Sequence, residues 1–153
     1  MKKTTFKKAT TFKFLFLSLV LLGLSSCGGG TLDNLKDAKE FLNTHKFSDS
    51  EATVKGRNDD NGMTTAFSMS FKDNKAIIGD ETLEYTIMST PDGSPNFNGP
   101  GFILKICGSE RYAYGGCING YLSSGRKGEI SLHILGDYIN AWFLENNGSI
   151  ESK

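Results

Sequence analysis

The sequence has few of the residues on which most catalytic and metal sites depend. It contains two histidines, His45 and His133, and three cysteines in 153 residues. It has no Cys-x-x-Cys pair, no phosphate-binding glycine loop and no Gly-x-Ser-x-Gly elbow, and neither histidine belongs to a metal-ligand spacing. We therefore expect no catalytic residue, no bound metal and no cofactor, and an enzyme is the least favoured interpretation.

Acidic residues are missing from the first 32 positions. Residues 1–13 carry five lysines, and residues 14–23, FLFLSLVLLG, are almost entirely apolar. A basic segment followed by a short apolar segment is typical of an export signal. Ten residues of helix rise about 15 Å, which is about half of the hydrocarbon thickness of a bilayer. The segment is therefore too short to serve as a membrane-spanning anchor.

The apolar segment leads into Leu24-Ser25-Ser26-Cys27. A leucine, two small residues and a cysteine in this order resemble the lipobox of bacterial lipoproteins. The resemblance implies that residues 1–26 are a cleaved signal peptide and that Cys27 carries acyl chains. Residues 27–31 would then tether a single domain spanning residues 32–153. No aspartate follows Cys27, which in the lipoprotein sorting rule implies the outer membrane. The periplasmic face is the expected side, with exposure on the cell surface left open.

Removing the leader leaves a mildly acidic chain. The whole sequence has 17 basic and 17 acidic residues, and five of the lysines lie in the leader. The mature chain therefore has 12 basic and 17 acidic residues, a net charge of −5. This balance argues against nucleic acid as a partner.

Two cysteines remain once Cys27 is assigned to the lipid, Cys107 and Cys117. An exported domain folds in an oxidising compartment, where such a pair is expected to form a disulfide. A metal pair or a redox dithiol is the alternative, and neither a nearby histidine nor a Cys-x-x-Cys spacing favours it.

Hydrophobic periodicity predicts one helix followed by strands. Apolar residues recur at helical spacing within residues 31–47, with Thr31 or Asp33 as the expected N-cap. From Met63 onward they alternate with period two, in about seven or eight short runs separated by turn sequences. We therefore expect a mainly β fold, with an N-terminal helix before an antiparallel meander. Because many strands tend to curl or close, a small barrel or strongly curved sheet is favoured, and a β-sandwich is the alternative.

The segment CGSERYAYGGCINGY, residues 107–121, concentrates aromatic and cationic side chains. Tyrosine and arginine are frequent anchors of protein interfaces. We take Arg111, Tyr112, Tyr114 and Tyr121 as a candidate partner-binding loop, because a loop closed by a disulfide loses little entropy on binding. The predicted function is a lipid-anchored, non-enzymatic binding protein of the cell envelope. Its partner would be another envelope protein, which it would serve as an inhibitor, adaptor or accessory subunit.

A carrier of a small apolar ligand is the alternative function. A barrel with an aromatic interior can hold such a ligand at its mouth, as lipocalins do. The residues expected to face inward are Phe67, Phe71, Tyr85, Phe102 and Trp142. The lipocalin opening, Gly-x-Trp near the first strand, is absent, because the one tryptophan lies near the C-terminus. Aromatic side chains can equally well fill so small a barrel.

Overall fold

The computed structural model of the chain describes residues 32–58, 61–90, 101–125 and 128–153. The predicted cleavage site, Cys27 and the glycine tether lie outside these residues. In chain order the elements are α1 (Leu35–Thr44), β1 (His45–Val54), β2 (Met63–Lys72), β3 (Lys75–Ile78), β4 (Glu81–Ser89), β5 (Gly101–Cys107), α2 (Glu110–Ala113), β6 (Cys117–Ser124), β7 (Ile130–Gly136), β8 (Ile139–Leu144), the 3₁₀ turn η1 (Glu145–Asn147) and β9 (Ile150–Ser152).

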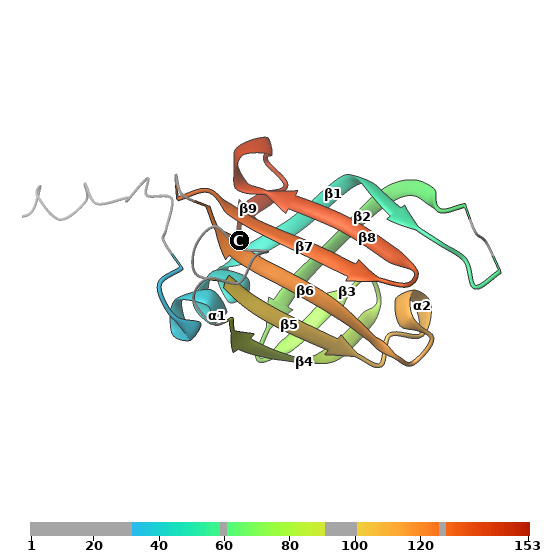
Figure 1. Cartoon of the computed structure of the whole chain (residues 1–153), viewed down its shortest axis with the longest axis horizontal. Coiled ribbons are helices and arrows are strands. Elements are labelled where there is room, and N and C mark those ends of the chain that lie inside the picture. The colour runs from blue at the N-terminus through green and yellow to red at the C-terminus, as the bar shows by residue number, and fades with distance from the viewer. Residues whose placement is uncertain (1–31, 59–60, 91–100, 126–127) are drawn as a thin grey trace, which may run out of the picture.

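The strands form one closed barrel (Figure 1). Strands β1 to β8 pair antiparallel with their neighbours in sequence, and β1 closes the ring by pairing with both β2 and β8. The short strand β9 adds to the first residues of β1. The predicted mainly β fold with an N-terminal helix is confirmed as an antiparallel barrel with one extra strand. The nine strands of the described residues all belong to a single sheet, which excludes the sandwich.

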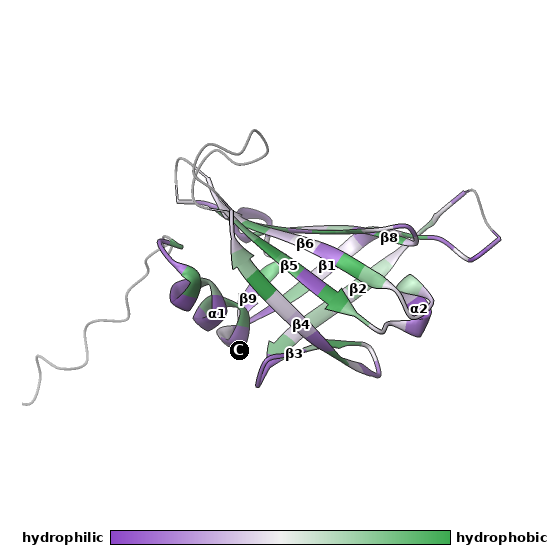
Figure 2. Cartoon of the chain, turned by 60° about the horizontal axis from the view of Figure 1, so that its bottom comes forward, coloured by the Kyte–Doolittle hydropathy of each residue, from purple (hydrophilic) through white to green (hydrophobic). Residues whose placement is uncertain are grey.

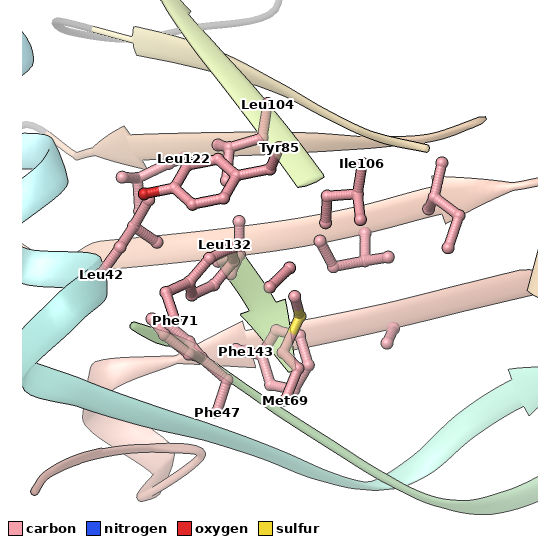
Figure 3. Packing of buried hydrophobic residues seen from close by; sticks show 14 of the residues in the cluster. Leu42, Phe47, Met69, Phe71, Tyr85, Leu104, Ile106, Leu122, Leu132 and Phe143 are labelled. Carbon is pink, nitrogen blue, oxygen red and sulfur yellow. The ribbon is translucent and has the colours of Figure 1, made fainter. Parts of the chain in front are cut away.

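Large apolar side chains pack the interior of the barrel. Phe47, Phe71 and Phe143 are fully buried, and the ring of Phe47 lies 5.7 Å from the rings of both other residues, edge to face. Figure 3 shows Leu122 of β6 and Leu132 of β7 pointing toward the same centre. The period-two alternation of the strands supplies this core, because it places every second side chain inside.

The helix α1 covers one end of the barrel. Its N-cap is Asn34, whose side-chain oxygen accepts two backbone N–H bonds of 2.9 and 3.1 Å, so the expectation of Thr31 or Asp33 was wrong. Figure 2 shows hydrophilic and hydrophobic residues alternating along α1. Its buried side, which includes Phe41 and Leu42, packs on the core. The helix therefore contributes to the core as an amphipathic lid.

The last residue ties the C-terminus to the same end. The backbone N–H of Lys153 donates to the carbonyl oxygen of Thr44 at 2.8 Å. Its ammonium donates to the carbonyl oxygens of Asn43 (2.7 Å) and Phe71 (2.6 Å). The bonds to Thr44 and Asn43 satisfy carbonyl groups that the end of α1 leaves without helical partners, and the bond to Phe71 ties the C-terminus to β2. Partial burial lowers the pKa of the Lys153 ammonium.

The barrel closes through an irregularity in β1. This strand pairs with β8 at Thr53 and Val54, and its register toward β2 shifts between Asp49 and Ala52. The Asp49 carboxylate accepts a hydrogen bond of 2.9 Å from the backbone N–H of Trp142 in β8. A side chain thus takes the place of a ladder hydrogen bond where β1 and β8 diverge.

Candidate functional site

The end of the barrel opposite α1 gathers four chain connections around α2 (Figure 1). They join β1 to β2, β3 to β4, β5 to β6 and β7 to β8. The β5–β6 connection holds α2 and touches each of the others, through Arg57, Glu81 at the start of β4, and Tyr138. The loop singled out from the sequence therefore lies at the centre of this end.

A carboxylate from another strand holds α2 in place. The N-cap Ser109 is fully buried, and its hydroxyl donates to Glu81 Oε2 at 2.7 Å while accepting from the Tyr112 N–H at 2.9 Å. Glu81 Oε1 accepts from the N–H groups of Glu110 (2.8 Å) and Arg111 (3.3 Å). These bonds satisfy the N–H groups that begin a helix, in the manner of a capping box whose carboxylate comes from elsewhere.

Cys107 and Cys117 lie at the base of this loop. They face each other in register at the ends of β5 and β6, and their Sγ atoms are 2.01 Å apart, at disulfide distance. The geometry therefore agrees with the pairing expected from the sequence. The cysteine pair restrains the loop at its base, and Glu81 restrains it from the side.

Tyr112 faces the barrel interior rather than solvent. Its side chain is 7% exposed, and its ring lies 5.3 Å from the ring of Phe67, edge to face. Burial raises the pKa of its hydroxyl. The Arg111 guanidinium lies 5.2 Å from the centre of the same ring. Tyr112 therefore supports the loop from within, and its burial leaves little surface for the partner contact expected of it.

Tyr114 is the tyrosine that this loop exposes. Its φ of +45° is a left-handed conformation that costs a non-glycine residue about 1–2 kcal/mol. The side chain is 39% exposed, its ring lies 4.6 Å from that of Tyr138, and the Arg57 guanidinium lies 5.3 Å from its centre. A bulky residue held in this conformation suggests a functional constraint.

An open hollow of about 370 Å³ lies beside Tyr114. We call it the α2 hollow, and its lining is Val54, Lys55, Gly56, Met63, Thr65, Arg111 and Tyr114. Two cations and no acid are among these residues, and Arg57 adds a third cation over the Tyr114 ring. The Met63 side chain is 70% exposed. The hollow thus combines apolar surface with positive charge, and its size suits a large side chain or a small ligand.

Tyr121 lies apart from the α2 hollow. It stands in the middle of β6 with its side chain on the outside of the barrel, and its ring is 6.2 Å from that of His133 on β7. Of the four residues expected to form one partner-binding loop, the structure brings Arg111 and Tyr114 together at the hollow. It places Tyr112 in the core and Tyr121 on the outer face of the sheet.

Sequence reasoning missed four residues of this site, Lys55, Arg57, Met63 and Tyr138. Three of them lie in or beside connections that meet the loop in space and not in sequence. The fourth, Met63, begins the period-two run predicted from the sequence, but the buried residues of β2 begin at Phe67. No local pattern distinguishes these positions, because their meeting depends on barrel closure.

The barrel interior contains four of the five residues expected there. Phe67, Phe71, Tyr85 and Phe102 are buried, whereas Trp142 lies on the outer face of β8 and is 51% exposed, so its inward placement was wrong. Among the described residues, the hydroxyl of Tyr85 is buried without a hydrogen-bond partner, and burial raises its pKa. A buried hydroxyl of this kind can donate a hydrogen bond to an acceptor atom of a ligand or of a water molecule.

No protein-family model, no curated protein and no solved structure matches this chain. Among the residues that the structure describes, no three histidine, cysteine or acidic side chains gather where they would hold a metal ion. The helices in this part of the chain are too short or too polar to cross a membrane. The function is therefore argued from the α2 hollow itself.

Proposed function

We propose that this chain is a non-enzymatic binding protein, held by lipid on Cys27 at the periplasmic face of a bacterial outer membrane. It binds an envelope protein through the α2 hollow, with Arg111 and Tyr114 as the main anchors. The observation that carries the proposal is that exposed Arg111 and Tyr114, on a loop fixed by Glu81 and the cysteine pair, line one hollow with the exposed Met63 of β2.

The chemistry of the hollow supports a protein partner. Arginine and tyrosine supply much of the binding energy in protein interfaces, because they combine apolar area with hydrogen-bonding groups. A loop held at its base and along its side has little conformational entropy left to lose when it binds. The loop that carries Arg111 and Tyr114 also lies at the end opposite α1 (Figure 1), which is the first element after the proposed tether.

A photo-crosslinking residue at position 63 tests the proposal in the envelope of the native host. We expect a discrete adduct from this position, and we expect Arg111→Ala combined with Tyr114→Ala to reduce its yield at least tenfold. Tyr112 is left intact, because its burial against Phe67 makes it a folding residue.

The matched control carries the same crosslinker at Glu40, an exposed position on α1 at the other end of the barrel. Position 40 is expected to give none of the adduct seen from position 63. If both positions give the same adducts, or if the double variant leaves the adduct unchanged, the α2 hollow is not the interface.

The carrier function remains the second candidate because of the buried Tyr85 hydroxyl, which has no described partner. A ligand inside the barrel would place an acceptor against it. Native mass spectrometry of the chain from residue 27, with Cys27→Ser, would then show an adduct of roughly a few hundred daltons. Tyr85→Phe would weaken this adduct, whereas a bare mass in the unsubstituted domain would exclude the carrier.

A further inference from the structure

Two groups of large apolar side chains are exposed among the described residues, apart from the single Met88 on β4. Met63 and Tyr114 belong to the α2 hollow, whereas Leu135 and Trp142 lie outside the barrel on the neighbouring strands β7 and β8. The exposed fractions of Leu135 and Trp142 are 41% and 51%. Single exposed apolar residues are ordinary, but neighbouring ones on one face indicate a contact surface.

The same face is almost free of charge. Strands β5 to β8 contain one charged side chain, Lys105. By contrast, strands β1 to β4 contain Lys46, Asp49, Glu51, Lys72, Lys75, Glu81 and Glu84. Between the apolar residues of β6 to β8, the outward positions are Asn119, Ser123, Ser131 and Asn140. We call the outward side chains of β6 to β8 the uncharged face, because these strands contain no aspartate, glutamate, lysine or arginine.

Aromatic rings form an ordered row across the uncharged face. Tyr121, His133 and Trp142 stand in register on β6, β7 and β8. The rings of His133 and Trp142 stack 3.8 Å apart at 10°, and His133 Nε2 lies 2.8 Å from Asn140 Oδ1. Asp49 also binds the Trp142 backbone N–H, and the stack with His133 holds the exposed indole in one place.

A membrane surface matches this chemistry. Tryptophan and tyrosine favour the interface between hydrocarbon and water, where the ring meets acyl chains and the N–H or O–H group meets water. The mature chain carries a net charge of −5, and an acidic face would be repelled by anionic lipid. A face with apolar, aromatic, amide and hydroxyl groups approaches a bilayer without this electrostatic repulsion.

The length of the tether keeps the domain beside the membrane. Residues 28–31 separate Cys27 from the first described residue, Leu32. Four residues span at most about 14 Å even when fully extended. A domain held so closely to a bilayer meets it repeatedly, so the effective concentration of the lipid surface is high.

We propose that the uncharged face rests on the lipid–water interface of the membrane that holds Cys27. This inference relies on the lipid anchor of the proposed function. Trp142 and Leu135 enter the headgroup region, and the barrel lies on β6 to β8.

A lipid anchor can be attached chemically to the purified chain. The membrane contact can then be tested independently of whether the host lipidates Cys27. With Cys107 and Cys117 paired, Cys27 is the free thiol of the mature chain, and it can be joined to a maleimide lipid in phosphatidylcholine vesicles. Trp142 is the one tryptophan, so its fluorescence reports on this face alone. We expect its emission to shift to the blue on anchoring and to be quenched by bromine-labelled acyl chains.

Charge placed on the uncharged face tests the contact directly. Leu135→Glu is expected to abolish both the blue shift and the quenching while leaving the tryptophan in place. The matched control is Met63→Glu, which charges a more exposed apolar residue at the α2 hollow and is expected to change neither signal.

Three results would overturn the proposal. The first is unchanged Trp142 emission on anchored vesicles, and the second is equal loss of signal in Met63→Glu. The third is a blue shift that rises with surface density but is insensitive to bromine, since this would identify a second copy of the chain as the occupant. Lipidation in the host is measured independently, from the mass of the mature N-terminus, and its absence would overturn the anchor.

Discussion

The two ends of this barrel are closed by different means. At the α1 end, apolar side chains such as Leu42 pack against the core, and Lys153 joins the C-terminus to the helix. At the α2 end, a buried serine, a carboxylate and a cysteine pair position a four-residue helix. The first end uses burial to stabilise the fold, whereas the second uses polar bonds to hold side chains at the surface.

This difference separates stability from recognition. Burial of a leucine contributes more free energy than one hydrogen bond, so the α1 end should dominate the free energy of unfolding. The α2 end exposes a methionine, a strained tyrosine and cations, none of which is placed to maximise stability. If this comparison holds, variants at the α1 end will change mainly the free energy of unfolding, whereas variants at the α2 end will change mainly partner binding.

The largest effect is expected for Leu42→Ala. Leu42 is fully buried at the α1 end, and removing it should lower the free energy of unfolding by roughly 2–5 kcal/mol. Urea denaturation followed by circular dichroism measures the loss. The neighbouring Asn43→Ala, on the exposed side of α1, should change stability by less than about 0.5 kcal/mol. In conditions where Leu42→Ala remains folded, loss of the position-63 adduct would show that the two ends are not independent.

Replacing both paired cysteines should have the next largest effect. Cys107→Ser combined with Cys117→Ser removes the restraint on a short loop, which the chain-entropy model values at roughly 2.5–3 kcal/mol. Unlike Leu42→Ala, it should also weaken the position-63 adduct, because α2 gains freedom. Reduction of the unsubstituted protein with dithiothreitol should reproduce both changes. If the reduced protein kept its stability and its adduct yield, the cysteine pair would have no role in either property.

Local sequence patterns predicted the fold because the barrel is built from local pairings. Period-two runs and turn sequences set each hairpin, and the helix follows from its apolar spacing. The closure of the barrel between β1 and β8 was not predictable in the same way. At that position Asp49 replaces a ladder bond to Trp142, a contact between residues 93 positions apart.

The candidate site was only partly predictable for a related reason. The segment containing Arg111 and Tyr114 stood out by composition, but its aromatic residues divide between core, hollow and outer face. Tyr112 turns inward because the N-cap at Ser109 sets the phase of α2. The contributions of Arg57 and Tyr138 depend on barrel closure, which no local pattern of either residue reveals.

A smaller effect is expected for Glu81→Gln at the α2 end. The substitution keeps the shape of the side chain but removes its charge, and hydrogen bonds to a charged group contribute roughly 1.5–3 kcal/mol. Because glutamine retains an acceptor, we expect a loss of about 1 kcal/mol together with a several-fold weaker adduct. Glu84→Gln on the same strand, an exposed partner of Lys75, should cost less than about 0.5 kcal/mol and leave the adduct intact. Equal effects at both positions would make Glu81 an ordinary surface carboxylate.

The smallest change in stability, with a large change in binding, is expected for Tyr114→Gly. Glycine relieves the left-handed strain at φ +45°, a gain of about 1 kcal/mol. The lost packing on Tyr138 costs a similar 0.5–1.5 kcal/mol by the typical value of an aromatic pair, so thermal unfolding should shift little. Tyr114→Ala loses the same ring but keeps the strain, so its stability should lie about 1 kcal/mol below that of the glycine variant. Both variants should lose the position-63 adduct. A Tyr114→Gly protein that keeps it would show that Tyr114 serves stability, as the residues of the α1 end do, and the contrast between the ends would fail.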